Sequence, residues 1–389
     1  MTTNHTTLSI LPPAMLGILG GGQLGRMFTI AAKTLGYRVT VLDPDPNAPA
    51  AEFADTHLCA PFDDATALTQ LAKCAAVTTE FENVSADAMR QLALTTRVSP
   101  SGDCVAIAQD REQEKAWIRK AGLPTAPYRV IRCLADINDD CTALLPGILK
   151  TATLGYDGKG QAQINSLPEL TEAFTKMGSV RCVLEQKLDL HTEISVVVCR
   201  LNSDNIACFP CAENQHECGI LAYSTVPARL PENLQQQAQQ LACRLADTLD
   251  YVGVLAVEMF VVGKDENLVI NEIAPRPHNS GHYTLDACST DQFQQQVRLM
   301  CGLPPADTHL LSPCCMANIL GDLWYENNEP NWQILLQPTN VYLHLYGKKT
   351  ARAGRKMGHY TVLSDNAGSA YTSAKELHRK LAEKPEKPI

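Results

Sequence analysis

The stretch that most restricts how this chain can fold is a pair of apolar runs that each carry one acid. The run 252–262 is apolar except for Glu258, and a short polar turn separates it from a second run, 268–270, which leads into Glu272. Two β-rich runs joined by a tight polar turn predict a β-hairpin. Glu258 and Glu272 are therefore expected on neighbouring strands.

These two acids require a positively charged partner. A carboxylate among apolar residues costs several kcal/mol unless a cation pairs with it. The carboxylates of Glu258 and Glu272 and the amide oxygen of Asn271 are hard oxygen donors, which suit Mg²⁺ shared with substrate phosphates. The next polar groups suit a small anion, and they belong to Arg276, His278, Asn279 and His282. We predict a metal–nucleotide site beside an anion site.

The bulk composition excludes several classes of protein. The 389 residues, 45% hydrophobic and 19% charged, are enough for two or three globular domains. The net charge of −9 argues against a nucleic-acid partner but not against nucleotides. No segment approaches the ~20 apolar residues of a membrane span, and the polar N-terminus shows no signal peptide. Fifteen cysteines scattered along apolar runs indicate reduced, buried thiols and a cytoplasmic protein.

The N-terminal region alternates short strands with helical runs, which predicts a parallel sheet. A strand at 15–19 leads into Gly20-Gly-Gly-Gln-Leu-Gly25, and the next strand ends at Asp43. Such a loop can place an anion at a helix N-terminus, and Asp43 stands near the position of a ribose-binding acid in dinucleotide folds. An NAD-dependent oxidoreductase, a phosphorylated substrate and a purely structural turn all remain open at this point.

Three further segments carry candidate binding groups. The segment Glu80 to Asn83 follows a strand expected at 75–79, at the end of a parallel sheet where ligands gather. A strand ending in Lys150 precedes a glycine-rich segment, 155–161, whose backbone amides can approach phosphates, although a hairpin turn without ligand fits equally well. Later strands present Glu185 and Glu193.

The last part of the chain changes character. Beyond the helix expected at 289–301 come short β-rich runs at 314–320, 340–346 and 360–363, which predict a small C-terminal domain. A basic cluster lies between them, comprising Lys348, Lys349, Arg352, Arg355, Lys356 and His359. A solvated face and a phosphate clamp are both compatible with this cluster.

In this order the motifs resemble the ATP-grasp superfamily, and more specifically the 5-(carboxyamino)imidazole ribonucleotide synthase family of purine biosynthesis. Six motifs from about Leu16 to about Leu363 carry the resemblance: Gly22-Gln-Leu-Gly-Arg-Met27, Glu80-Phe-Glu-Asn-Val84, Gln109-Asp-Arg111, Gly155-Tyr-Asp-Gly-Lys-Gly-Gln161, Asn271 to His282, and Gly354-Arg-Lys-Met-Gly-His359.

The resemblance implies an α/β fold with three domains. These are a Rossmann-like parallel-sheet domain at 1–110, an ATP-grasp domain with a glycine-rich flap at 111–305, and a small β-rich C-terminal domain at 306–389. A lid subdomain would occupy about 125–190. The implied enzyme is a homodimer.

The implied reaction consumes ATP, bicarbonate and 5-aminoimidazole ribonucleotide, with Mg²⁺, and it releases ADP and phosphate. The nucleotide would contact Arg111, Lys150, Gly155, Tyr156, Asp157, Gly158, Lys159, Gly160, Gln161, Glu185, Gln186, Lys187, Leu188, Glu193, His216, Asn271 and Glu272. The metal would bind Glu258 and Glu272. Catalysis would involve bicarbonate held by Arg276, His278 and Asn279, together with Lys150. The ribonucleotide would contact Gly22, Gln23, Leu24, Glu80, Asn83, Tyr156, Lys348 and Arg355.

Three alternatives compete with this assignment. Formate-dependent glycinamide ribonucleotide transformylase has a similar glycine loop, but Asn279-Ser-Gly-His282 matches the carboxylating family better. An NAD-dependent oxidoreductase leaves Glu258, Glu272 and the glycine-rich segment unexplained. A catalytically silent nucleotide-binding protein has no need of paired acids, because folding alone favours apolar residues at such positions.

Overall fold

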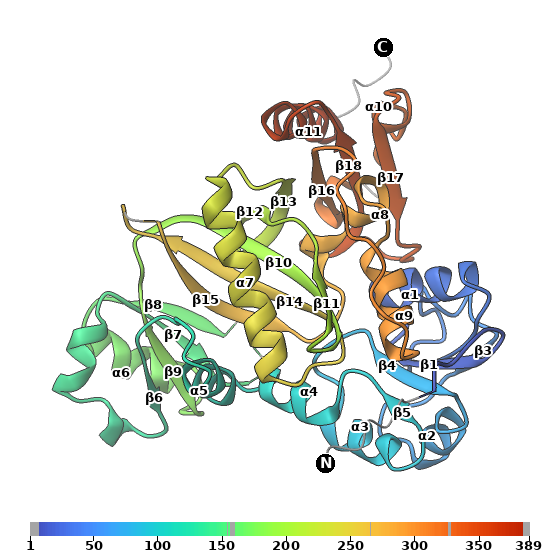
Figure 1. Ribbon diagram of the computed structural model, residues 1–389. Coiled ribbons are helices and arrows are strands. Elements are labelled where there is room, and N and C mark those ends of the chain that lie inside the picture. Colours follow the sequence, from blue (N-terminus) through green and yellow to red (C-terminus); the bar gives the residue numbers. More distant parts are fainter. Residues whose placement is uncertain (1–7, 154, 156–159, 265, 326–327, 384–389) are drawn as a thin grey trace.

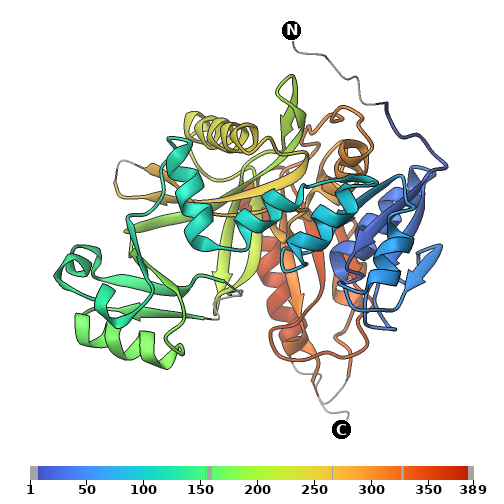
Figure 2. The ribbon, with the colours of Figure 1, turned by 90° about the horizontal axis from the view of Figure 1, so that it is seen from below.

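The computed structural model describes residues 8–153, 155, 160–264, 266–325 and 328–383. Three β-sheets and their flanking helices make up the fold (Figure 1). The five-stranded and four-stranded sheets lie at opposite ends of the molecule, with the nine-stranded sheet between them, as the view from below also shows (Figure 2). Within the described ranges no helix has both the length and the apolar character needed to cross a bilayer.

The N-terminal sheet is parallel, as its alternating pattern predicts, with strand order β3-β2-β1-β4-β5. Its strands are β1 (Met15–Leu19), β2 (Arg38–Leu42), β3 (Thr56–Leu58), β4 (Ala76–Thr79) and β5 (Arg97–Val98). Its helices are α1 (Gln23–Thr34), α2 (Ala65–Leu71), α3 (Ala86–Ala93) and α4 (Gly102–Ala108). The strand order reverses between β1 and β4, and ligands of open α/β sheets bind at such a point. The glycine loop and the segment after β4 meet there.

The second sheet is small and antiparallel, with strand order β6-β9-β7-β8. Its strands are β6 (Tyr128–Ile131), β7 (Gly147–Thr151), β8 (Gln161–Ile164) and β9 (Cys182–Gln186). It is accompanied by α6 (Leu167–Lys176) and two short 3₁₀ helices, Leu134–Asp136 and Asp139–Leu144. Helix α5 (Arg111–Lys120) leads into it, beginning at Asp110, whose carboxylate accepts the backbone N–H groups of Glu112 and Gln113.

The nine-stranded sheet is antiparallel, with order β15-β14-β10-β12-β13-β16-β18-β17 and β11 paired to β10. Its strands are β10 (Leu190–Asn202), β11 (Asn205–Cys208), β12 (Ala212–Glu217), β13 (Ile220–Val226), β14 (Gly253–Val262), β15 (Asn267–Ala274), β16 (Cys314–Leu320), β17 (Val341–Leu345) and β18 (Lys356–Leu363). The predicted C-terminal strands are present, and β16 pairs with β13. They therefore extend the central sheet instead of building a sheet of their own.

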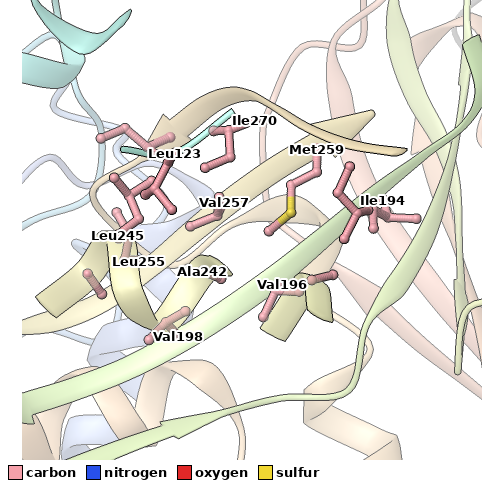
Figure 3. Packing of buried hydrophobic residues seen from close by; sticks show 14 of the residues in the cluster. Leu123, Ile194, Val196, Val198, Ala242, Leu245, Leu255, Val257, Met259 and Ile270 are labelled. Carbon is pink, nitrogen blue, oxygen red and sulfur yellow. The ribbon is translucent and has the colours of Figure 1, made fainter. Parts of the chain in front are cut away.

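The remaining helices cover this sheet. They are α7 (Glu232–Thr248), α8 (Thr284–Ala287), α9 (Gln292–Met300), α10 (Gln333–Leu336) and α11 (Ala367–Ala382), with 3₁₀ turns at Asn279–Gly281 and Gly321–Leu323. Helix α7 packs Ala242 and Leu245 against Val196, Leu255 and Val257 in the core beneath the hairpin (Figure 3). This packing fixes β14, on which Glu258 stands. All fifteen cysteines are free thiols.

Candidate active site

The predicted hairpin exists, and a β-bulge shapes its chemistry. Glu258 on β14 lies directly opposite Glu272 on β15, but the next pair is Met259 with Ile270, so Asn271 is an extra residue. Neighbouring residues of a regular strand point to opposite faces, and a bulge re-aims one of them. Asn271 and Glu272 accordingly both line one cavity. The bulge thus adds an amide oxygen to the two carboxylates.

The oxygen atoms of this hairpin are only partly compensated by the chain. Arg111 donates to Glu272 Oε2 at 3.0 Å, and His278 Nε2 lies 3.1 Å from Glu258 Oε1. Among the described residues the buried Oδ1 of Asn271 accepts no hydrogen bond. Burial, and next the charge of Glu272, raise the pKa of the Glu258 carboxyl. A further cation at the hairpin would relieve this cost.

The His278 ring is oriented by its neighbours. The backbone N–H of Ser280 donates to His278 Nδ1 at 3.3 Å, so that nitrogen carries a lone pair. The proton then resides on Nε2 and is donated to Glu258. Burial, followed by Arg276, lowers the pKa of His278, which is therefore neutral. Fixed in this way, the imidazole stands between the acidic hairpin and Arg276.

One face of helix α5 contacts both the hairpin strand that carries Glu272 and the residues expected to bind the nucleotide. Glu114 Oε1 accepts the backbone N–H of Ile273 at 2.7 Å, directly beside Glu272. Lys115 is fully buried and lies 3.2 Å from Glu185 Oε2, which also accepts from Lys150 at 3.2 Å. Burial, and then Glu272, raise the pKa of Glu114 to about 7. Sequence reasoning missed Glu114 and Lys115, because a helix this rich in charge has the pattern of a solvent-exposed one.

The expected nucleotide residues gather on one wall of the cavity. These lining residues are Arg111, Lys150, Gly155, Gln161, Glu185, Gln186, Lys187, Leu188, Glu193 and His216. His216 Nδ1 is 2.7 Å from Glu193 Oε2. Burial alone would lower the pKa of His216, but the hydrogen bond to Glu193 raises it. Gly160 has a φ of +71°, which favours glycine, and lies beside Thr151. Tyr156, Asp157, Gly158 and Lys159 lie outside the described residues.

The groups expected to hold an anion occupy the middle of the cavity, with one exception. Arg276, His278 and Asn279 line it. Neither polar atom of the buried Asn279 amide has a hydrogen-bond partner among the described residues, as expected of a group that awaits a ligand. The expectation for His282 is wrong. Its Nδ1 accepts from Gln292, its ring packs 4.8 Å from that of His359, and it does not line the cavity.

The glycine loop is closed by carboxylates of the chain itself. Glu80 accepts the N–H groups of Gly22 and Gly25, each at 2.6 Å, and Asp43 accepts that of Gly21 at 2.7 Å. A Cβ at Gly25 would lie 2.5 Å from the carbonyl oxygen of Gly20, which explains this glycine. Asp43, the acid that would bind the ribose of a dinucleotide, is therefore hydrogen-bonded to the loop itself. Gly22, Gln23, Leu24, Glu80 and Asn83 all line the cavity.

The predicted basic cluster is only partly at the cavity. Lys348 lines it and donates to Gln23 Oε1 at 2.7 Å, and Lys356 lines it as well. Burial, and then Arg355, lower the pKa of Lys348 to about 8. Arg355 is not among the lining residues, and its guanidinium donates to the carbonyl oxygen of Thr350 at 2.7 Å. A substrate role for Arg355 stays a prediction.

One cavity of about 820 Å³ joins all these groups. Lys150 comes from the four-stranded sheet and the glycine loop from the five-stranded sheet, which lie at opposite ends of the molecule. Arg276, which follows the acidic hairpin, pairs with Glu82 on the side of the glycine loop. The volume lies within the range of small-molecule binding pockets.

Comparison with known proteins agrees with this arrangement. Family models match the chain in three adjacent parts: a ribonucleotide synthetase preATP-grasp domain at 14–109, an ATP-grasp domain at 116–293, and a phosphoribosylaminoimidazole carboxylase C-terminal domain at 314–372. The N5-carboxyaminoimidazole ribonucleotide synthase of Bacillus subtilis is 43% identical over 91% of this chain and 92% of its own length. That of Brucella melitensis is 44% identical over 91% and 97%.

This chain belongs to the N5-carboxyaminoimidazole ribonucleotide synthase family. The resemblance inferred from six motifs is confirmed, as is the ATP-grasp fold with its N-terminal parallel sheet. The dehydrogenase alternative is excluded by the same finding.

Solved structures of this family superpose over nearly the whole chain. An ADP complex of an N5-carboxyaminoimidazole ribonucleotide synthetase has a TM-score of 0.88 and 44% identity, covering 96% of this chain and 98% of its own. An Aspergillus clavatus N5-carboxyaminoimidazole synthase in complex with ADP and 5-aminoimidazole ribonucleotide has a TM-score of 0.86 and 32% identity, covering 95% and 98%. This family fold therefore binds a nucleotide and a ribonucleotide together in at least one member.

Proposed function

We propose that this protein carboxylates 5-aminoimidazole ribonucleotide, using ATP and bicarbonate, to give 5-(carboxyamino)imidazole ribonucleotide, ADP and phosphate. The observation that carries the proposal is the single cavity with an acidic hairpin at one end and a basic, glycine-lined wall at the other. Such a cavity can hold Mg·ATP and a phosphorylated sugar at once. Family membership supports the same reaction.

The acidic end would hold the nucleotide and its metal. Glu258, Glu272 and Asn271, whose Oδ1 accepts no hydrogen bond from any described residue, form the all-oxygen donor set that Mg²⁺ prefers. When bound, Mg²⁺ would neutralise charge on the β- and γ-phosphates during transfer. Arg111, which pairs with Glu272, and Lys150, which pairs with Glu185, would contact the phosphates. Gln186, Lys187, Leu188, Glu193 and His216 would line the base and ribose.

The middle of the cavity would hold bicarbonate. Bicarbonate is a poor electrophile, and phosphorylation to carboxyphosphate gives it a leaving group. Arg276 offers a guanidinium fork, Asn279 an amide with free hydrogen-bonding capacity, and neutral His278 a ring held in place by Ser280. The intermediate hydrolyses readily, so water exclusion by the 155–161 segment is part of the proposal.

The basic end would hold the ribonucleotide. Lys348 is available to its phosphate, while Gly22, Gln23, Leu24, Glu80 and Asn83 surround the space beside it. Tyr156 and Arg355 are proposed to complete this site. We also infer that the protein acts in the cytoplasm, where its fifteen thiols stay reduced, and that it forms a homodimer, as the family resemblance implies.

One assay tests the reaction directly. ADP release is measured with the aminoimidazole ribonucleotide, with and without bicarbonate, and then with formate and glycinamide ribonucleotide. We expect ADP release only when the aminoimidazole ribonucleotide and bicarbonate are both present, together with incorporation of labelled bicarbonate into the ribonucleotide. ADP release that requires formate, or that is indifferent to bicarbonate, would overturn the proposal.

A further inference from the structure

The side chain of Arg276 is held by an acid from another part of the molecule. Its Nε donates to Glu82 Oε2 at 2.5 Å, and its Nη1 donates to the carbonyl oxygen of Pro277 at 3.1 Å. Both charged side chains are largely buried, with 15% of the Arg276 side chain and 29% of that of Glu82 exposed. Arg276 follows β15 of the nine-stranded sheet, whereas Glu82 follows β4 of the parallel sheet. The ion pair therefore bridges two sheets at the cavity.

Glu82 is itself rigidly placed. Gln109 Nε2 donates to the backbone carbonyl oxygens of Glu82 and Val84, which clamps the loop after β4. Two residues earlier on the same loop, Glu80 points the other way and binds the amides of Gly22 and Gly25. One clamped loop thus sends one carboxylate toward the ribonucleotide end and another toward Arg276.

We propose that Glu82 is the positioning residue for Arg276, holding the guanidinium so that its free N–H groups face a planar carbonate-class anion. A guanidinium has five N–H donors in a fixed fork, and the described contacts use two of them. The Nη1 and Nη2 groups keep donors that suit a bidentate oxyanion. This inference rests on the proposed function, which places bicarbonate at Arg276.

Charge supports the same role. Burial alone would raise the pKa of the Glu82 carboxyl, but Arg276 lowers it, so the acid remains ionised and keeps its partner. Without Glu82 the long arginine side chain could turn toward Glu258 or Glu80, whose charges it also feels. The anion would then lose an oriented donor, while the residues proposed to bind ATP would be unchanged.

The test compares two variants at Glu82 with a matched control. Glu82→Gln removes the charge at nearly constant shape, and Glu82→Asp keeps the charge but shortens its reach. Glu213→Gln is the control, because it breaks another Arg–Glu pair, with Arg229, away from this cavity. For each protein the KM values for bicarbonate, ATP and ribonucleotide are measured separately, along with the melting temperature.

We expect Glu82→Gln to raise the KM for bicarbonate at least about tenfold while the KM for ATP changes less than about twofold. Glu82→Asp should fall between wild type and Glu82→Gln, and Glu213→Gln should change neither KM. An unchanged KM for bicarbonate in Glu82→Gln, or an equal rise for all substrates, would overturn the inference and leave only a structural clamp. Failure of the proposed function is recognised separately, because wild-type ADP release would then not depend on bicarbonate.

Discussion

The two ends of the cavity use acidic residues in opposite ways. At the glycine loop, Asp43 and Glu80 are bonded to backbone N–H groups of the chain. The Lys348 ammonium donates to Gln23 and to the carbonyl oxygen of Lys356, which leaves one of its three N–H donors for an incoming anion. At the hairpin, Glu258 and Glu272 face each other, and the buried Oδ1 of Asn271 has no partner among the described residues. The loop end therefore offers hydrogen-bond donors that suit a negatively charged ligand, and the hairpin end offers oxygen acceptors that suit a positively charged one.

This difference shows that an acidic residue near a cavity does not by itself mark a metal site. What matters is whether the chain already supplies the hydrogen-bond donors. Backbone amides satisfy Glu80 within its own sheet, whereas the hairpin acids contact the side chains of Arg111 and His278 and, under the proposed function, an external cation. Substitutions at the two ends should consequently have different signatures.

The largest effect is expected at the hairpin. Glu272→Gln removes one of two carboxylates for the metal, so turnover should fall at least about a hundredfold while the fold is retained. Steady-state ADP release and circular dichroism provide the measurements. Glu172→Gln, an exposed acid on α6, is the control and should match wild type. Retention of more than about a tenth of the wild-type rate would contradict the metal role.

At the opposite end, Lys348 should make ribonucleotide binding depend on pH. Its amine is charged below a pKa of about 8 and loses its charge as the pH rises through that value. The kcat/KM for the ribonucleotide reports groups of the free enzyme and should therefore decline above about pH 8. Lys348→Arg should abolish this decline, because guanidinium stays protonated. A wild-type profile that is flat from pH 7 to about 9.5 would remove Lys348 from the phosphate site.

A moderate effect on stability is expected at Glu80. Burial raises the pKa of this carboxyl to about 7, above its unfolded value, so its contribution to stability is fully present at acid pH and is lost as the pH rises from about 4.5 to about 7. The loss should be about 3 kcal/mol. The free energy of unfolding of Glu80→Gln, measured with urea, should therefore fall less over this interval than that of wild type. Parallel curves for the two proteins would show that Glu80 does not titrate there.

The smallest effect is expected at Arg355. Its guanidinium lies outside the cavity lining, so Arg355→Ala should raise the KM for the ribonucleotide only about threefold. The KM for ATP should rise less than this. Comparison of the two KM values decides this. Equal changes in both KM values, or no change, would show that Arg355 belongs to the solvated surface and does not contact the ribonucleotide.

Local pattern was sufficient for the hairpin. Two apolar runs joined by a polar turn placed Glu258 and Glu272 on neighbouring strands, and the structure puts them directly opposite. The bulge at Asn271 was not foreseen, because register depends on the packing of β15 against α5 and on the bond from Ile273 to Glu114. Local pattern left open whether the glycine loop binds a phosphorylated ligand or is a structural turn. It did not reveal that Glu80, which is distant in sequence, accepts the N–H groups of this loop.

The pairing of strands far apart in the chain could not be predicted either, because local sequence patterns do not reveal distant partners. The strands at 314–320, 341–345 and 356–363 were expected at nearly these positions, but nothing in their periodicity shows that β16 joins β13. Likewise, the charged face of α5 has the pattern of a surface helix, although Glu114 and Lys115 are buried by elements that come later in the chain.

The pairing of β13 with β16 also bears on how the protein can be cut or fused. Removing everything from β16 onward would strip a full hydrogen-bonding partner from β13 and leave a long, apolar strand edge open to other chains. The 76 residues from β16 onward therefore cannot fold as a separate domain or be removed without damage to the central sheet. A shortened version should aggregate, and heating should melt the central and terminal portions in a single cooperative event.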